Sequence, residues 1–230
     1  MEPQVRYAIG NANTREMLAG MAHQRTSNAL TALASGAAFV VSCVSLWETS
    51  LKQPDLQFYL GQNLSLTRDP WVSDEVLVVP ITITNGGARD GAVLSMQLDV
   101  RNVTTGTTDR FQSSYTVDAS YFGATDDVTQ FRHRPKVPFS PVVVSGRTTY
   151  SGTILFYPVK SHEKYSIGPK SSIELVASLE TAKPADWVDK MLAGKPESVS
   201  VKLDVPDFLP GALLAGDLAR LHPPEARAAP

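Results

Sequence analysis

The chain has 230 residues, of which 19% are charged, and its formal net charge is -2 at pH 7. This length suits one ordinary domain of roughly 100 to 150 residues with attached segments, and it is too short for two large domains. The small net charge offers no basic surface that would attract a nucleic acid by counterion release, so no nucleic-acid partner is expected. The single cysteine cannot form an intramolecular disulfide, so core packing alone must stabilise the domain.

The first predicted element is a transmembrane helix over residues 26–47. This run, TSNALTALASGAAFVVSCVSLW, carries no charge and lies between Arg25 and Glu48. About 20 helical residues suffice to cross a hydrocarbon layer of ~30 Å, so the run has a spanning length. Thr, Ser and Asn dilute its apolar character, and the buried helix of a soluble protein is the alternative. We expect Arg25 and Trp47 to lie at the two membrane interfaces.

The basic residues near this run indicate its orientation. Arg15 and Arg25 precede it closely, whereas Lys52 is the only base close to its other end. Positive charge is enriched on the cytoplasmic side of membrane helices. We therefore expect residues 1–25 to be a cytoplasmic N-terminal segment. The helix would pass once through the inner (cell) membrane, with the lipid bilayer as its partner, and the remaining chain would be periplasmic or otherwise extracytoplasmic.

Cys43 leaves a second mode of attachment open. The residues VVSC at 40–43 resemble a lipobox, in which the cysteine becomes the lipidated first residue of a mature lipoprotein. A lipidated cysteine normally begins a flexible polar tether, yet VSLW continues the apolar run after Cys43. The pattern therefore favours an uncleaved anchor, in which Cys43 is a small apolar residue.

Small residues recur at four-residue spacing in the same run. Ala32 and Gly36 are four residues apart, and so are Ala34 and Ala38 one register over. This spacing lets two membrane helices approach closely. It predicts packing of the helix against an integral membrane protein or complex in the same membrane; the alternative is a lipid-facing anchor that is merely rich in alanine.

Residues 48–206 show the alternation of a β domain. A first strand is expected from Leu56 to Leu66. The segments VLVVPITITN and VLSMQLDVRN alternate apolar and polar residues, which is typical of half-buried strands. Between them NGGARDG supplies residues that tolerate positive φ, and it predicts a hairpin. The residues expected to face inward are Val79, Ile81 and Ile83, then Leu94, Met96, Leu98 and Val100.

The same alternation returns in the second half of the chain. It covers TTYSGTILFYP, SSIELVASLET and SVSVKLDVP, and less clearly residues 109–117. A short helix is expected over residues 184–193, because proline suits its first turn and Gly194 its end. Six or seven alternating strands without long helices between them predict a mainly β fold, an antiparallel β-sandwich. The residues expected inward are Ile173, Leu175, Ala177 and Leu179, then Val199, Val201, Leu203 and Val205.

The segment VLVVPITITNGGARDGAVLSMQLDV resembles the second and third strands of the immunoglobulin-like modules of bacterial envelope proteins. In those modules a strand that ends in Asn-x-Gly leads into the next strand. The resemblance implies an immunoglobulin-like antiparallel β-sandwich on a single membrane anchor, and as a likeness of fold it implies no specific function. The Cys-Trp-Cys core of antibody domains is absent, which excludes that branch of the fold.

The C-terminal tail, residues 207–230, is expected to be partly helical and then disordered. Leu214, Leu218 and Leu221 fall on one side of a short amphipathic helix, and the proline and alanine residues that follow favour disorder. So short a helix is unstable alone and becomes ordered by packing, either on its own domain or in a partner's groove. These three leucines are the predicted partner contacts.

No constellation of residues predicts catalysis, and no metal or cofactor is expected. The four histidines are scattered, and no two have the i, i+4 spacing of ligands on one helical face. Ser161 and Lys164 match a serine–lysine hydrolase pattern, but they fall in a polar loop instead of opening a helix. The basic cluster Arg132, His133, Arg134 and Lys136 suits lipid phosphates or an acidic partner, and otherwise is an ordinary surface loop.

These observations predict a non-catalytic, membrane-anchored accessory or assembly subunit of an envelope protein complex. Helix and β domain together would bind another membrane protein. The alternative is an extracytoplasmic module, anchored by a helix or as a lipoprotein, that binds a small molecule or glycan at the loops on one end of the sandwich.

Overall fold

The computed structural model describes residues 28, 30–69, 71–117, 136–160, 165–182, 198–215 and 217–224. It divides into two compact units, Met1–Leu51 and Lys52–Pro230. The predicted N-terminal segment with Arg25, the predicted helix over residues 184–193 and the Ser161/Lys164 pair lie outside the described residues, as do the last six residues of the tail.

The first unit contains a helix, Leu30–Leu51, that is long and apolar enough to cross a membrane; a signal sequence near an N-terminus would have the same character. It is α-helical over residues 30–46 and ends in a π-helical turn, η1, at Trp47–Leu51. The hydroxyl of Ser42 donates to the carbonyl of Ala38 at 2.8 Å, one helical turn earlier. The helix therefore extends beyond the predicted end at residue 47.

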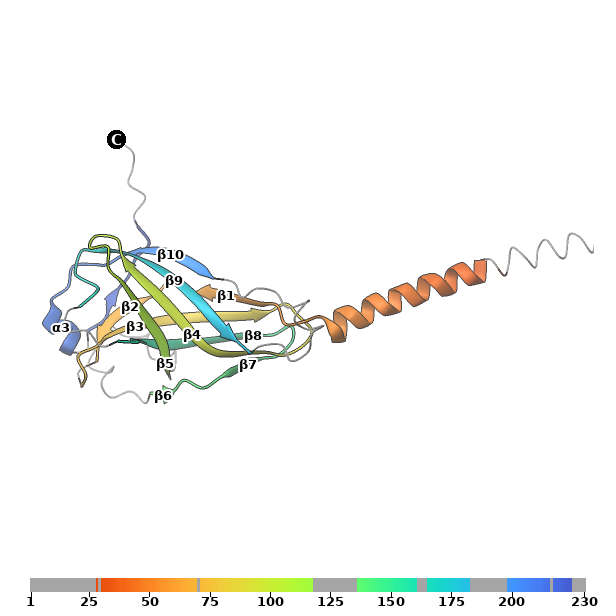
Figure 1. The fold of residues 1–230 in the computed structure, drawn as a ribbon, viewed down its shortest axis with the longest axis horizontal. Coiled ribbons are helices and arrows are strands. Elements are labelled where there is room, and N and C mark those ends of the chain that lie inside the picture. Colours follow the sequence, from red (N-terminus) through yellow and green to blue (C-terminus); the bar gives the residue numbers. More distant parts are fainter. Residues whose placement is uncertain are drawn as a thin grey trace, which may run out of the picture. The chain divides into compact units, whose positions relative to one another are not determined.

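The second unit is built on one antiparallel sheet that curls around its core (Figure 1). Its strand order is β10-β9-β4-β5-β8-β3-β2-β11; in addition β1 pairs with β3, β6 with β5 and β7 with β4. The predicted mainly β, antiparallel fold is thereby confirmed. The strands are β1 Leu56–Leu60, β2 Ser65–Arg68, β3 Glu75–Asn85, β4 Gly91–Asn102, β5 Thr108–Val117, β6 Val137–Pro138, β7 Val142–Val144, β8 Thr149–Pro158, β9 Ser172–Thr181, β10 Val199–Asp204 and β11 Ala219–Arg220.

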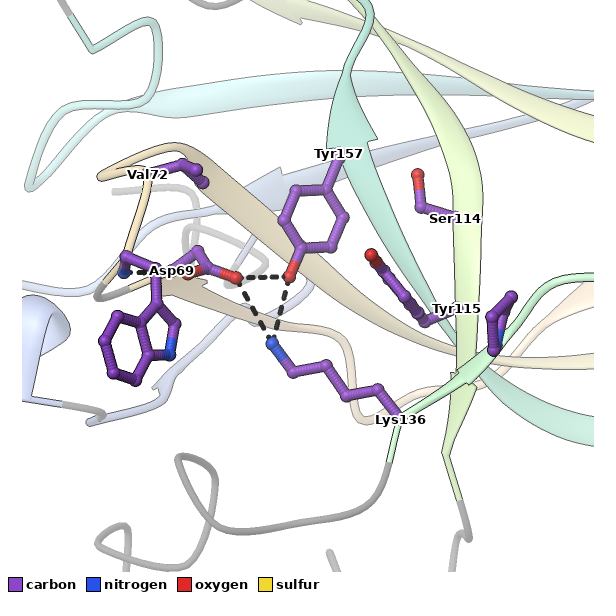
Figure 2. Close-up of a pocket in the computed structure, with 8 residues that line it drawn as sticks. Asp69, Val72, Ser114, Tyr115, Lys136 and Tyr157 are labelled. Atoms are coloured by element: carbon purple, nitrogen blue, oxygen red, sulfur yellow. Dashed lines mark hydrogen bonds and ion pairs between the residues drawn. The ribbon is translucent and has the colours of Figure 1, made fainter.

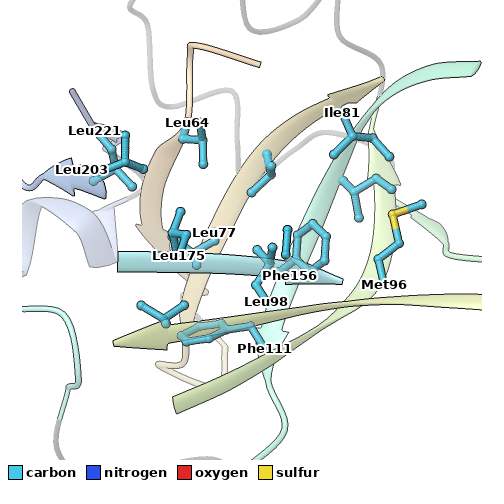
Figure 3. Packing of buried hydrophobic residues seen from close by; sticks show 14 of the residues in the cluster. Leu64, Leu77, Ile81, Met96, Leu98, Phe111, Phe156, Leu175, Leu203 and Leu221 are labelled. Atoms are coloured by element: carbon cyan, nitrogen blue, oxygen red, sulfur yellow. The ribbon is translucent and has the colours of Figure 1, made fainter. Parts of the chain in front are cut away.

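The inner face of the curled sheet holds the main apolar core (Figure 3). The alternation predicted for β3 and β9 is confirmed, because every residue expected inward in these two strands is buried. In β10 Leu203 is buried, as is Val205 just beyond it, whereas Val199 and Val201 are half-buried against the core. The largest fully buried side chains are Phe58, Phe111, Phe156, Leu66, Leu77, Ile83, Met96, Leu98, Ile154, Leu155, Ile167 and Ile173.

A smaller apolar cluster lies on the opposite face of the same sheet. We call Val76, Val78, Val117 and Leu155 the outer cluster. Val76 and Val78 alternate with Leu77 and Val79, which belong to the main core, so the first half of β3 is buried on both faces. Two tyrosines and Leu218 pack against the outer cluster.

Two predictions about the first strands are wrong. The strands β3 and β4 form no hairpin: β3 pairs with β1, β2 and β8, whereas β4 pairs with β5, β7 and β9. The expected strand from Leu56 to Leu66 is divided into β1 and β2, which both pair with β3. The division lies opposite Pro80, which has no N–H to offer the ladder, and there the Gly61 amide donates to the Pro80 carbonyl at 2.8 Å.

Leu94 is a further correction. The pairing of β4 with β9 shifts register between Val93 and Ser95, which is a β-bulge. Val93 consequently takes the inward position, and Leu94 is 41% exposed. Met96, Leu98 and Val100 beyond the bulge face inward as predicted.

The tail departs from the predicted helix. The helix α3 spans only Pro210–Ala215, and the chain then extends into β11, which pairs with β2. Leu214 and Leu218 are half-buried, and Leu221 is 1% exposed within the main core. A single amphipathic helix through these three leucines is therefore wrong, because pairing with β2 satisfies the backbone better than a free helix would. Leu221 packs on its own domain, where it is not exposed to a partner.

The Asn-x-Gly motif joins three segments of the domain. Asn85 is 2% exposed, and its Oδ1 accepts from the amides of Asp55 (3.1 Å) and Gly87 (2.9 Å). Its Nδ2 donates to the carbonyls of Arg89 and Val144, both at 2.9 Å. One side chain thus joins the start of the domain, the β3–β4 loop and the end of β7. A Cβ at residue 87 would collide with the Gln53 backbone, which explains the glycine there.

We predict that Asn85→Ala lowers the free energy of unfolding by about 2–4 kcal/mol, because it leaves buried amides and carbonyls without partners. Urea denaturation followed by the β-sheet circular dichroism signal measures this loss. Asn63→Ala, at an exposed position, is the control and should change the value by less than about 0.5 kcal/mol. Equal, small effects of both substitutions would contradict the role of Asn85.

Candidate functional site

The candidate site is a groove on the outer face of the sheet, near the Glu75 end of β3. Its cavity volume is about 890 Å³, within the range of small-ligand sites, roughly 300–1,000 Å³. Figure 2 shows the side chains that surround it and the hydrogen bonds among them. Those used below are Asp69, Trp71, Ser114, Tyr115, Lys136 and Tyr157.

A tight turn between β2 and β3 presents Trp71 at this groove. The Asp69 carboxylate accepts through Oδ1 from the Trp71 amide at 2.9 Å. The Asp69 backbone closes the turn. Its carbonyl accepts from the Ser73 amide at 2.8 Å, and its amide donates to the Asp74 carbonyl at 2.9 Å. Aspartate favours such turns because its side chain can bond the backbone two residues on. Trp71 is nevertheless 88% exposed, so the turn is ordered while its largest apolar side chain faces solvent.

The other carboxylate oxygen of Asp69 binds the floor of the groove. Oδ2 accepts from the Tyr157 hydroxyl at 2.7 Å and from Lys136 Nζ at 3.2 Å. Lys136 Nζ also donates to the Tyr157 oxygen at 3.1 Å, so the three groups form a closed triangle. The side chains of Lys136 and Asp69 are 21% and 9% exposed, which makes this a partly desolvated ion pair.

This triangle shifts the pKa values of Asp69 and Tyr157. Burial by itself raises the pKa of Asp69, but hydrogen bonds from Tyr157 and the Trp71 amide, together with the charge of Lys136, lower the pKa overall. Burial and the adjacent Asp69 carboxylate raise the pKa of Tyr157. At neutral pH Asp69 is therefore a carboxylate and Tyr157 a neutral phenol.

Tyr115 and Tyr157 pack against the outer cluster, and Tyr157 also belongs to the triangle. The rings of Tyr115 and Tyr157 meet edge to face, with centroids 5.6 Å apart and an interplanar angle of 66°. In β5 the register with β8 shifts between Ser113 and Tyr115. Such a bulge re-aims side chains, and here it lets the consecutive residues Ser114 and Tyr115 both line the groove.

A second buried polar cluster lies nearby in sequence but serves the fold. Glu75 accepts from the amides of Ser166 and Ile167, both at 3.0 Å, and from the Ser166 hydroxyl at 2.6 Å. Burial raises the pKa of Glu75 despite these bonds. Arg68, its partner in the β2–β3 register, lies over the ring of Tyr165, 2.9 Å from Cζ to centroid. These contacts fasten the loop before β9 to the β2–β3 pair.

The site residues predicted from sequence lie elsewhere. Ala32, Ala34, Gly36 and Ala38 are exposed on the helix of the first unit, as is Trp47. Of the basic cluster at residues 132–136, Lys136 is described and belongs to the groove. Across the described ranges, no group of three His, Cys, Asp or Glu side chains is placed to hold a metal ion.

Sequence reasoning missed Asp69, Trp71, Tyr115 and Tyr157. The stretch RDPWVSD carried a usable signal, because a tryptophan among turn-forming residues is expected to be exposed. Alternation in TILFYP places Tyr157 opposite Phe156 and hence outward. The contact of Lys136 with Asp69 joins residues 67 positions apart and follows only from the folded chain.

Comparison with known proteins leaves the chain without an assigned family. No protein-family model and no curated protein matches it. Among solved structures, the crystal structure of a Bordetella pertussis protein provisionally named ApaA matches over 76% of this chain and 98% of that chain. The two share 12% sequence identity with a TM-score of 0.32, a likeness too low to carry an argument about function.

We predict that Asp69→Asn destabilises the domain at neutral pH and that the difference from the parent shrinks in acid. The folded-state pKa of Asp69 lies below its ordinary value of 3.8. The stability it contributes is therefore present above 3.8 and is lost as the pH falls through the folded pKa. Urea midpoints of both chains, from neutral pH to below 3.8, measure the difference.

The contribution of Glu75 to stability varies with pH in the opposite direction. Because its pKa is raised above 4.5, its contribution is present below 4.5 and is lost as the pH rises through the folded value. It is common to both chains and cancels in their difference. A difference between the parent and Asp69→Asn that does not vary with pH would contradict the role assigned to the Asp69 charge.

Proposed function

We propose that this chain is a non-catalytic, membrane-anchored binding protein whose β domain captures its ligand in the groove beside Trp71. The observation that carries the proposal is an indole that is 88% exposed on a hydrogen-bonded turn, next to a partly desolvated Asp69–Lys136 pair. A large exposed aromatic beside ordered polar groups is typical of recognition sites. Because the turn is ordered in advance, little conformational entropy is lost on binding.

The helix Leu30–Leu51 is the proposed anchor. It has the length and composition of a spanning helix, and its described side chains are exposed in the chain on its own. We propose a single pass through the inner membrane, with the N-terminus cytoplasmic and the β domain extracytoplasmic, on the weight of the basic residues that precede the run.

We further infer that the domain is a variant of the immunoglobulin-like sandwich. In this proposal the pairings β1–β3–β8 and β4–β9–β10 would be the counterparts of the two sheets of that fold. The strand β5 pairs with both β4 and β8, so it would join the two sheets along one edge. This connection supports a sandwich that is closed on one side.

We predict that a compound bound by this domain raises the unfolding temperature of the parent chain but not that of Trp71→Ala. A ligand that binds only the folded state stabilises it by about 2.7 kcal/mol at 100 times its Kd. A thermal-shift screen of sugars, lipid headgroups and peptides, run on both chains, tests this. Tyr59→Ala, which removes an aromatic that is 51% exposed on β1, is the matched control and should respond as the parent does.

Two outcomes of this screen would count against the groove as the binding site. If no compound of any class distinguishes the parent from Trp71→Ala, the groove is not a binding site. A compound that stabilises both chains equally binds at another place.

A second candidate function is an accessory subunit of a membrane complex, held through the helix. The small residues Ala32, Ala34, Gly36 and Ala38 leave room for a neighbouring helix, and a Cβ built at Gly36 meets nothing within 4 Å. The two functions are compatible, because one uses the helix and the other the β domain.

We predict that Gly36→Ile weakens a complex that copurifies in mild detergent, since the larger side chain separates the helix backbones. Leu46→Ile, also on the helix, changes shape without adding bulk and serves as the control. Copurification of the same stoichiometric partner with the parent and with Gly36→Ile would contradict packing through this face.

A further inference from the structure

We infer that the groove beside Trp71 binds an uncharged sugar residue of a glycan. This inference rests on the proposed function and names its ligand class. It follows from three properties of the groove: a compensated charge, exposed aromatic surface and unused hydrogen-bonding capacity.

The charges of the floor compensate each other. Asp69 and Lys136 are 3.2 Å apart, and Tyr157 bonds to both. An anionic ligand would have to compete with Asp69 for Lys136, and a cationic ligand would have to compete with Lys136 for Asp69. Removing one partner of a desolvated pair is costly, so a ligand without charge fits this floor best.

The walls suit a ligand with both apolar and hydroxyl-bearing surfaces. A pyranose ring presents C–H groups on its faces and hydroxyls around its rim. Trp71 offers the broad aromatic face on which such a ring can stack, and the Tyr115–Tyr157 pair supplies a second aromatic surface (Figure 2). An acyl chain would suit the aromatic groups but would desolvate the Asp69–Lys136 pair without replacing its water.

Hydrogen-bonding capacity remains for the sugar hydroxyls. A carboxylate has about four lone-pair sites, and the contacts described for Asp69 use three of them: the Trp71 amide, the Tyr157 hydroxyl and Lys136. The Ser114 hydroxyl donates to the Gln112 carbonyl at 3.2 Å and can still accept, and the Tyr115 hydroxyl can both donate and accept. Acceptors and donors thus stand within one groove at the edge of an aromatic platform, as sugar recognition requires.

The test is isothermal titration of the full chain in a detergent without a sugar headgroup, because alkyl glycosides would themselves compete. The probes are neutral trisaccharides of glucose, galactose, mannose and N-acetylglucosamine. Trigalacturonate and the trimer of glucosamine are the anionic and cationic counterparts of similar size. We expect at least one neutral trisaccharide to bind in preference to both charged ones.

Variants locate the binding. Trp71→Ala should weaken the affinity for that trisaccharide by about tenfold or more, and Trp71→Phe should restore part of it, because stacking needs an aromatic face. Tyr59→Ala should bind as the parent does. The inference is overturned if no neutral trisaccharide binds, if the charged ones bind better, or if Trp71→Ala binds unchanged.

These outcomes separate the inference from the function on which it rests. Stabilisation of the parent but not of Trp71→Ala by a peptide or a lipid headgroup alone would overturn the sugar inference and leave the binding function standing. The absence of any compound with that selectivity would overturn both.

Discussion

The carboxylate of Asp69 is the interaction on which the proposed site depends. Its two oxygens face different parts of the chain: Oδ1 orders the turn that carries Trp71, and Oδ2 holds Tyr157 and Lys136 on the floor. Wall and floor are therefore fixed by a single residue. A fully solvent-exposed ion pair would contribute little to the stability of this arrangement. Partial burial of the carboxylate makes its bonds stronger and makes an unpaired state costly.

A second buried polar side chain, Asn85, joins several segments at the end of β3 that is distant from the groove. The strand β3 runs from Glu75, beside the groove, to Asn85, beside the residues that begin the domain. At about 3.3 Å per residue, these ends are roughly 33 Å apart. The domain thus separates the point where its chain begins from the surface proposed to bind. The apolar residues of β3 between the two ends join both sites to one core.

Periodicity in the sequence was sufficient for the strands and insufficient for their pairing. Alternation identified the inward residues of β3 and β9, because these residues fall on one face of each strand, but it did not show that the first half of β3 is buried on both faces. It could not show that β3 and β4 pair with different strands, because a loop of turn-forming residues suits a hairpin and a crossover connection equally. The bulge at Val93 likewise shifted Leu94 outward without a local signal. The tail differs from the predicted helix because Ala219 and Arg220 pair with β2 and Leu221 beside them is buried, and these contacts are distant in sequence.

The groove was harder to predict than the fold, for a related reason. Asp69, Lys136 and Tyr157 come from three segments, which only the pairings β2–β3, β3–β8, β8–β5 and β5–β6 bring together. The sequence shows Lys136 as one of several neighbouring basic residues, whereas in the fold its partner is Asp69. Local signals existed for Trp71 and Tyr157, which the turn and the strand alternation place outward.

The order of the Trp71 turn is the most direct test of this arrangement. We would measure the order parameter of the Trp71 backbone amide by ¹⁵N relaxation, in the parent chain and in Asp69→Ala. We predict a value of about 0.85 in the parent, as for rigid backbone, and a clear decrease in the variant. A value below about 0.6 in the parent, or the same value in both chains, would show that Asp69 does not hold Trp71 in place for binding.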